Sequence, residues 1–150
     1  MKLEPKDADF EARVRESFQR QQVMTTFGAT MTRVSGGEVE IELPFNAALT
    51  QQHGYLHAGV ITTILDNACG YAASTLMDRD SAVLTVEFKT NFMAPAKGEL
   101  LRCTANVVRA GKTLTVCRAE AWMHANETPI HTATMQATLM ALAGTDARRG

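Results

Sequence analysis

The sequence predicts an α+β fold in which an antiparallel sheet wraps around one long central helix, with a further helix at the N-terminus. The first reason is the order of elements: two strand-like segments precede a long apolar stretch and four follow it. The second is that stretch itself, residues 58–77, which carries a single charged side chain and needs apolar walls around it. The third is the length of 150 residues, which suits one domain.

The N-terminal segment, residues 5–24, predicts an amphipathic helix on the outside of the domain. Phe10, Val14 and Phe18 recur at intervals of four residues among charged side chains. This spacing places the three apolar side chains on one face of a helix.

The next segments predict a hairpin, with strands at residues 25–34 and 38–44 joined by a Ser-Gly-Gly turn. In the second strand Val, Ile and Leu alternate with Glu, which is typical of a strand with one covered face. Residues 45–57 then form a loop that leads into the central helix.

Four strands are predicted after the central helix, because apolar and polar residues alternate there and the connecting turns carry Gly or Pro. These strands are residues 82–93, 99–109, 113–124 and 129–142. We therefore expect three parts: an N-terminal helical extension (1–24), the main domain (25–142) and a flexible polar tail (143–150).

Composition narrows the classes of function. Fifteen basic and sixteen acidic residues leave no basic field, which argues against nucleic acid as a partner. The charged N-terminal segment has no apolar signal core, and Asp66 and Asn67 interrupt the apolar stretch, so we expect no membrane association. Cys69, Cys103 and Cys117 are odd in number and form no CxxC pair, which indicates buried thiols in a reducing cytoplasm.

A metal site is not expected. His53 and His57 have the spacing of two metal ligands on a helix, but the Glu that follows the first His of an HExxH motif is missing. Gly54 also disfavours a helix at this point. The sequence therefore calls for no metal or other cofactor.

Asp66 is the strongest functional signal in the chain. A lone carboxylate in a buried segment costs several kcal/mol or shifts its pKa, so it is usually paired, ligating or catalytic. Its neighbours at helical spacing, such as Thr62 and Gly70, are small enough to leave a groove beside it. A purely structural acid would need partners, and only Thr and Asn side chains are close in the sequence. We expect Asp66 to be catalytic.

The turn before the helix supplies a second set of candidates. The first N–H groups of a helix lack partners and carry partial positive charge, so the N–H of Ala58 suits the oxyanion that develops on a carbonyl under attack. Gly54 and Gly59 allow a tight turn and a close approach to a ligand. His57 either caps the helix or orients the substrate, and Gln51 either donates to the carbonyl or positions water.

The segment from residue 51 to residue 66 resembles the active-site segment of hotdog acyl-CoA thioesterases, in particular the PaaI-like group of the 4-hydroxybenzoyl-CoA thioesterase superfamily. That group shows Asn, then Gly, then His-Gly-Gly, then Asp nine residues after the His. The matching positions here are Gln51, Gly54, His57, Ala58, Gly59 and Asp66. Gln51 and Ala58 depart from the usual Asn and Gly, which leaves the acyl preference open. The resemblance implies a hotdog fold that hydrolyses acyl-CoA to a free carboxylic acid and coenzyme A.

Helix geometry predicts that the active site is shared. Asp66 lies eight residues after Ala58, so the two are ~12 Å apart along the helix. Catalytic contact requires ~3 Å, so one chain cannot supply both groups to one carbonyl. We expect a homodimer with antiparallel helices and composite sites. The resemblance implies the same dimer, often a tetramer of two dimers, with Thr85 near the partner's acid. Asp66 acts as nucleophile or as general base.

Two other functions are weighed. An acyl thioester dehydratase of this fold is disfavoured, because its Phe-Pro turn and helical Glu are absent. A non-catalytic acyl-CoA binding module is also disfavoured: sensors of this fold tend to carry a DNA-binding helical domain, and the N-terminal helix here is too small for one.

Arg109 and Lys112 either bind the phosphates of coenzyme A or are ordinary hairpin charges. An apolar acyl pocket is predicted from Tyr71, Met77, Phe88 and Phe92.

Overall fold

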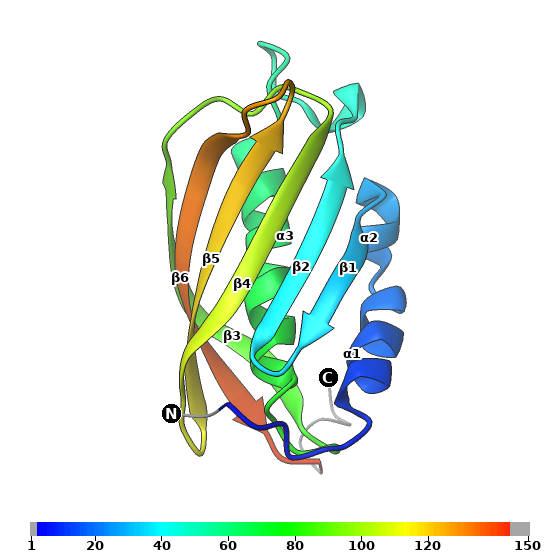
Figure 1. Cartoon of the computed structure of the whole chain (residues 1–150), viewed down its shortest axis with the longest axis vertical. Coiled ribbons are helices and arrows are strands. Elements are labelled where there is room, and N and C mark those ends of the chain that lie inside the picture. The colour runs from blue at the N-terminus through cyan, green and yellow to red at the C-terminus, as the bar shows by residue number, and fades with distance from the viewer. Residues whose placement is uncertain (1–2, 145–150) are drawn as a thin grey trace.

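Six antiparallel strands form one sheet in the computed structural model, which describes residues 3–144 (Figure 1). The order across the sheet is β1-β2-β4-β5-β6-β3, so β1 and β3 are its edges. The four strands predicted after the central helix are confirmed to within one residue at each end. The strands are β1 (Thr30–Ser35), β2 (Glu38–Pro44), β3 (Ala82–Phe92), β4 (Leu100–Ala110), β5 (Leu114–His124) and β6 (Ile130–Leu142).

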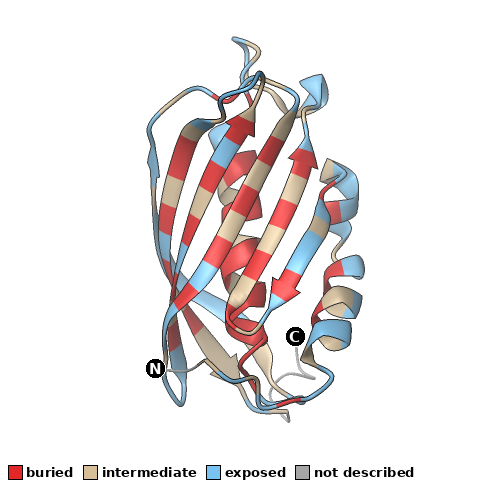
Figure 2. Cartoon of the chain, in the orientation of Figure 1, coloured by how far each residue is buried: buried red, intermediate tan, exposed pale blue. Residues whose placement is uncertain are grey.

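The long helix α3, Ala58–Ser74, packs against one face of this sheet and contacts β2 through β6. Buried residues alternate along the strands and fill the side of α3 that meets them (Figure 2). The predicted α+β fold with a central helix is thereby confirmed. Neither α3 nor any other helix within residues 3–144 has the length and apolar character needed to cross a membrane. The buried core residues of α3 include Val60, Ile61, Ile64, Leu65, Ala68, Cys69 and Ala72.

The expectation that α3 is enclosed on every side is wrong for the single chain. One stripe of the helix stays half-buried, because the sheet covers only the opposite side of α3. The edge strand β3 is likewise uncovered, with every residue from Leu84 to Lys89 exposed. The half-buried residues of α3 are Thr62, Thr63, Asp66, Asn67 and Gly70.

Two helices precede the sheet and lie beside its β1 edge (Figure 1). The predicted amphipathic helix is α1, Phe10–Gln19, which buries Val14 and Phe18. The second, α2 (Gln22–Phe27), was not predicted, and the strand expected over 25–34 starts only at residue 30. The cause is a helix stop: Gly28 caps α2 at φ +75°, while the buried Met24 anchors it. These tertiary and capping effects outweigh the strand propensity of the threonines nearby.

The predicted division into three parts stays a prediction. α2 runs three residues past position 24, and β6 ends at residue 142 as expected. Of the predicted tail, residues 145–150 lie outside the described part of the chain.

Candidate active site

The start of α3 presents a backbone donor. His57 is the N-cap residue, with extended backbone, and its Nδ1 accepts a hydrogen bond of 2.8 Å from the N–H of Gly59. The cap explains the glycine, since a Cβ at residue 59 would lie 3.1 Å from His57 Nδ1. The N–H of Ala58 has no acceptor among residues 3–144. The arrangement leaves one N–H at the positive end of a helix dipole free to bind an anion.

The turn before the helix fixes the side chain of Gln51. Gly54, at φ +80°, donates its N–H to the carbonyl of Gln51 at 3.0 Å, and Gln51 donates its own N–H to the carbonyl of Tyr55 at 2.9 Å. The Oε1 of Gln51 accepts from the N–H of His53. The NH2 group of the same amide has no partner among residues 3–144, so it is available to donate to a ligand.

A cavity of about 480 Å³ opens beside this turn and contains both Gln51 and Ala58. Its remaining walls are largely apolar, so a carbonyl bound there meets few competing donors. These walls consist of Tyr55, Leu56, Ile61, Phe92, Met93, Ala94, Pro95 and Ala96.

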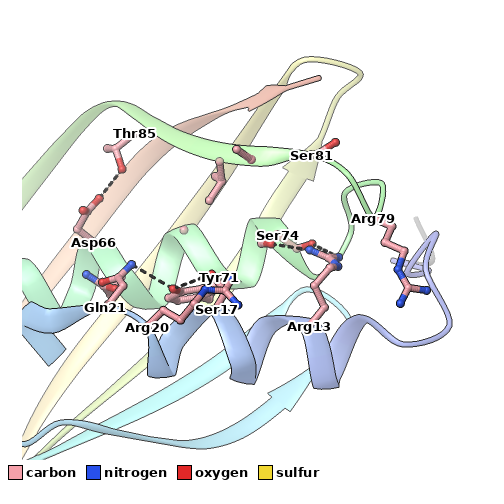
Figure 3. A pocket seen from close by; sticks show the side chains of 14 residues that line it. Arg13, Ser17, Arg20, Gln21, Asp66, Tyr71, Ser74, Arg79, Ser81 and Thr85 are labelled. Carbon is pink, nitrogen blue, oxygen red and sulfur yellow. Dashed lines mark hydrogen bonds between the residues drawn. The ribbon is translucent and has the colours of Figure 1, made fainter. Parts of the chain in front are cut away.

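Asp66 lies in a different cavity, two turns further along α3. The Thr85 hydroxyl donates a hydrogen bond of 2.8 Å to Asp66 Oδ1 (Figure 3). Partial burial raises the pKa of Asp66, and the hydrogen bond from Thr85 opposes this by stabilising the charged form. The expectation that Thr85 lies near the partner's acid is corrected, because β3 passes over α3 of its own chain. A shift of register after Thr85 marks a bulge in β3 at this point.

The structure does not bring the two halves of the predicted site together within one chain. Ala58 and Gln51 line the first cavity, whereas Asp66 and Thr85 line the second. At ~1.5 Å per residue, Ala58 and Asp66 are ~12 Å apart along α3. Within one chain, the helix N–H and the carboxylate therefore lie in separate cavities.

The second cavity, of about 390 Å³, has walls that the sequence did not reveal. Besides α3 and β3, the N-terminal helices line it through Arg13, Ser17, Arg20 and Gln21 (Figure 3). No motif in the N-terminal segment signals this role, since its polar residues read as an ordinary solvated face. The other lining residues are Asn67, Gly70, Tyr71, Ser74, Arg79, Ser81, Ala82 and Val83.

Arg13 holds α1 in place against this cavity. Its guanidinium donates to the Ser74 hydroxyl at 3.1 Å and to the Ser74 carbonyl at 3.0 Å, at the C-terminal end of α3. The same guanidinium forms an ion pair of 3.0 Å with Asp7. A cation at a helix C-terminus also meets the negative end of the helix dipole. Arg13 thus links the N-terminal helix to the end of α3.

Arg109 and Lys112 were predicted either to bind the phosphates of coenzyme A or to be ordinary hairpin charges. Arg109 and Lys112 are exposed at the β4–β5 turn, at the opposite end of the molecule from His57 (Figure 1), and line neither cavity. Their role toward coenzyme A stays a prediction.

The predicted apolar acyl pocket needs correction. Tyr71 lines the Asp66 cavity and Phe92 lines the other, so the two do not share one pocket. Met77 is buried below the end of α3, while Phe88 is 44% exposed on β3. The polar residues that surround Asp66 replace the apolar lining expected from sequence.

Comparison with known proteins gives a consistent picture. The sequence matches the family described as "Thioesterase superfamily" over residues 53–129, just over half of the chain. A thioesterase family protein from Silicibacter pomeroyi has a solved structure that is 52% identical, with a TM-score of 0.89 over 90% of this chain and 99% of that one. Human acyl-coenzyme A thioesterase 13 is 33% identical over 57% of this chain and 61% of its own length. The PaaI protein of E. coli shares the fold, with 18% identity and a TM-score of 0.80 over 91% of this chain and 95% of that one.

Proposed function

This chain belongs to the thioesterase superfamily, and we propose that it hydrolyses acyl-CoA thioesters to free carboxylic acids and coenzyme A with Asp66 as the catalytic carboxylate. The predicted resemblance to the hotdog thioesterases is confirmed by the family match and by the shared fold. The observation that carries the catalytic assignment is the pair of half-sites: a helix N–H at Ala58 that has no acceptor in the described part of the chain, and a carboxylate held by Thr85.

The active unit in this proposal is a homodimer. The edge strand β3 is exposed from Leu84 to Lys89, and an uncovered edge of this kind pairs readily with another strand. Phe88 and Phe92 pair with residues of β6 that are buried in the core, yet they are 44% and 48% exposed. A second copy that pairs its β3 with this one would cover these rings and place its own α3 alongside. Antiparallel helices then bring Ala58 of one subunit to Asp66 of the other.

In the composite site, the thioester carbonyl lies against the turn of one subunit. The Ala58 N–H receives the developing oxyanion, and the free NH2 of Gln51 donates to the same carbonyl or holds water. His57 keeps the helix end in place through its cap. The substrate is bound through backbone and amide donors, with no metal ion invoked.

Asp66 of the other subunit then starts the attack. As general base, it takes a proton from water while the water oxygen bonds to the carbonyl carbon; the carbon–sulfur bond then breaks, and the same proton passes to the sulfur, which leaves as the thiol of coenzyme A. As nucleophile, its own oxygen bonds to the carbonyl carbon, the carbon–sulfur bond breaks to release coenzyme A, and water then cleaves the resulting anhydride to the free acid and the regenerated carboxylate. A pKa raised by burial suits either route, since it makes the carboxylate more basic near neutral pH.

Assembly and location complete the proposal. We place the enzyme in the cytoplasm, supported by three free cysteines that are all buried. Two such dimers assemble into a tetramer in this proposal, as the resemblance implies. The acyl-CoA substrate is the one partner the site calls for.

Replacing the carboxylate tests the function. Asp66→Asn keeps the size of the side chain and an acceptor for Thr85, and we expect it to lower kcat by ~100-fold or more on any acyl-CoA that the wild type hydrolyses. Release of free thiol measures the rate. Asp80→Asn, which changes an exposed acid in the turn between α3 and β3, serves as control. Near-normal turnover of a folded Asp66→Asn variant would overturn the assignment.

A further inference from the structure

The outer face of the sheet, which is turned away from α3, carries a hollow of about 520 Å³ over β3, β5 and β6. Side chains alternate along these strands, so the residues between buried ones point outward (Figure 2). The hollow shares no lining residue with the cavities at Asp66 and Ala58, so it is separate from the proposed active site. Its lining residues are Glu87, Lys89, Asn91, Arg118, Glu120, His131, Thr134, Met135 and Gln136.

Two cationic side chains stand in one cross-strand row of this hollow. Gln136 of β6 is paired in register with Lys89 of β3 on one side and with Arg118 of β5 on the other. Neighbouring strands lie ~4.8 Å apart, so the backbones of the two cationic residues are ~10 Å apart with Gln136 between them. Both side chains are long enough to reach a small anion placed above the Gln136 amide.

Neither cation has a counter-ion in the described part of the chain. The side chains of Lys89 and Arg118 form no ion pair and no hydrogen bond within residues 3–144, and the amides of Asn91 and Gln136 are likewise without a partner there. All four side chains carry N–H donors. The row therefore offers positive charge and donors that the folded chain does not use.

The two carboxylates of the hollow are already bonded in the adjacent rows. Glu120 accepts a hydrogen bond of 2.6 Å from His131 Nε2 and one of 3.0 Å from the Thr134 hydroxyl. Glu87 accepts a hydrogen bond of 2.6 Å from the Thr138 hydroxyl. These bonds hold both carboxylates beside the row of cations rather than between its members.

Elsewhere on the same face, arginines are paired. Arg33 of β1 forms an ion pair with Glu38, and Arg102 of β4 forms one of 2.7 Å with Glu42. The register places Glu42 directly opposite Arg102, whereas it places a neutral amide opposite Arg118. Because like charges in one row repel each other, an anion bound between them would stabilise the arrangement.

We propose that Lys89 and Arg118, one on each side of Gln136, form a binding site for a phosphate group. A guanidinium binds phosphate through two parallel N–H···O bonds, and an ammonium adds a point charge. Phosphate carries up to two negative charges at neutral pH and has oxygens left for the amides of Gln136 and Asn91, so it matches this set better than a carboxylate does. Pairing of β3 with a second copy would occupy its backbone edge and leave Lys89 on the outer face. The site goes beyond the proposed function and does not depend on it.

Isothermal titration calorimetry with inorganic phosphate tests the site, with sodium chloride of equal ionic strength as the reference. The wild type should bind phosphate saturably. Lys89→Gln and Arg118→Gln should each raise Kd by about tenfold, the effect of losing one hydrogen bond to a charged group, and the double variant should show no saturable binding. Arg33→Gln is the matched control, because it removes a paired arginine of the same face, and it should leave Kd unchanged.

Adenosine monophosphate distinguishes the two sources of a phosphate group. Tighter binding than that of inorganic phosphate, weakened by Arg118→Gln, would identify a nucleotide as the ligand, and weaker or equal binding would identify the free ion; both results support the site.

Unsaturable phosphate binding by the wild type, or a Kd that survives the double variant, would overturn the inference. Light scattering tests the other occupant, a second copy of the chain. A smaller oligomer of the double variant, with no phosphate binding by the wild type, would show that Lys89 and Arg118 pair with that copy and would likewise overturn the phosphate site.

Discussion

Removing the hydroxyl that holds Asp66 gives a prediction whose direction follows from the structure. Thr85→Val deletes the donor 2.8 Å from Asp66 Oδ1 and keeps the shape of the side chain. That hydrogen bond lowers the pKa of Asp66, so its loss lets burial raise the pKa further. Activity requires the ionised carboxylate, and the acidic limb of the pH–rate profile should therefore move to higher pH. The same hydrogen bond holds the carboxylate in one orientation, so we expect about a tenfold loss of kcat even above the pKa, because the freed carboxylate is no longer held in position for attack.

The assay is kcat as a function of pH for wild type, Thr85→Val and a matched control. Thr90→Val is that control: it lies on the same strand, and its buried hydroxyl has no partner among the described residues. Its removal should change neither the limb nor the plateau, because no bond is lost. If the acidic limb of Thr85→Val stays in place or moves to lower pH, Thr85 does not stabilise the charge on Asp66.

Two further outcomes are expected. Burial raises the pKa of Asp66, so the contribution of this residue to folding stability is greatest below its ordinary pKa of 3.8 and falls as the pH rises through the raised pKa. Asp66→Asn should therefore melt at a higher temperature than the wild type at neutral pH, and calorimetry should show this difference closing below about pH 3.8. His57→Ala should lose the cap on Gly59 and ~1 kcal/mol of unfolding free energy in urea titrations. His53→Ala should lose nothing, because the His53 side chain is exposed and has no partner within residues 3–144; equal stabilities of the two variants would contradict the capping role.

Much of the fold is predictable from periodicity. The strands between residues 82 and 142 alternate cleanly, and their turns carry Gly or Pro, so their limits were found to within a residue. The segment 25–34 was misassigned because threonine favours strands, while Gly28 and the buried Met24 end a helix there. Local propensity cannot weigh a buried anchor that becomes visible only after folding.

The site was predictable in its chemistry and less so in its surroundings. Asp66 stands out because a lone charge interrupts an apolar stretch, and Ala58 because it opens that helix. Thr85 was found only through the resemblance, and its placement near the partner's acid was wrong. Ser17 and Gln21 gave no signal, because their role depends on how α1 packs against α3.

The central claim is that two subunits complete each active site, and mixing two inactive variants tests it most directly. Ala58→Pro removes only the donor N–H: proline is well tolerated at the first position of a helix, and His57 before it has ψ 138°, as a residue before proline requires. Loss of one oxyanion donor should cost ~100-fold or more in kcat. The partner variant is Asp66→Asn, and each variant alone must remain a folded dimer.

In a mixed dimer, one site receives both damaged groups and the other receives the intact Ala58 N–H and the intact Asp66. Subunit exchange of equal amounts under mild denaturant should therefore restore about a quarter of wild-type activity, because half of the dimers are mixed and each has one working site. Mass spectrometry verifies the mixed dimers. Recovery to that level is the predicted result, and mixed dimers no more active than either variant alone would contradict the shared active site.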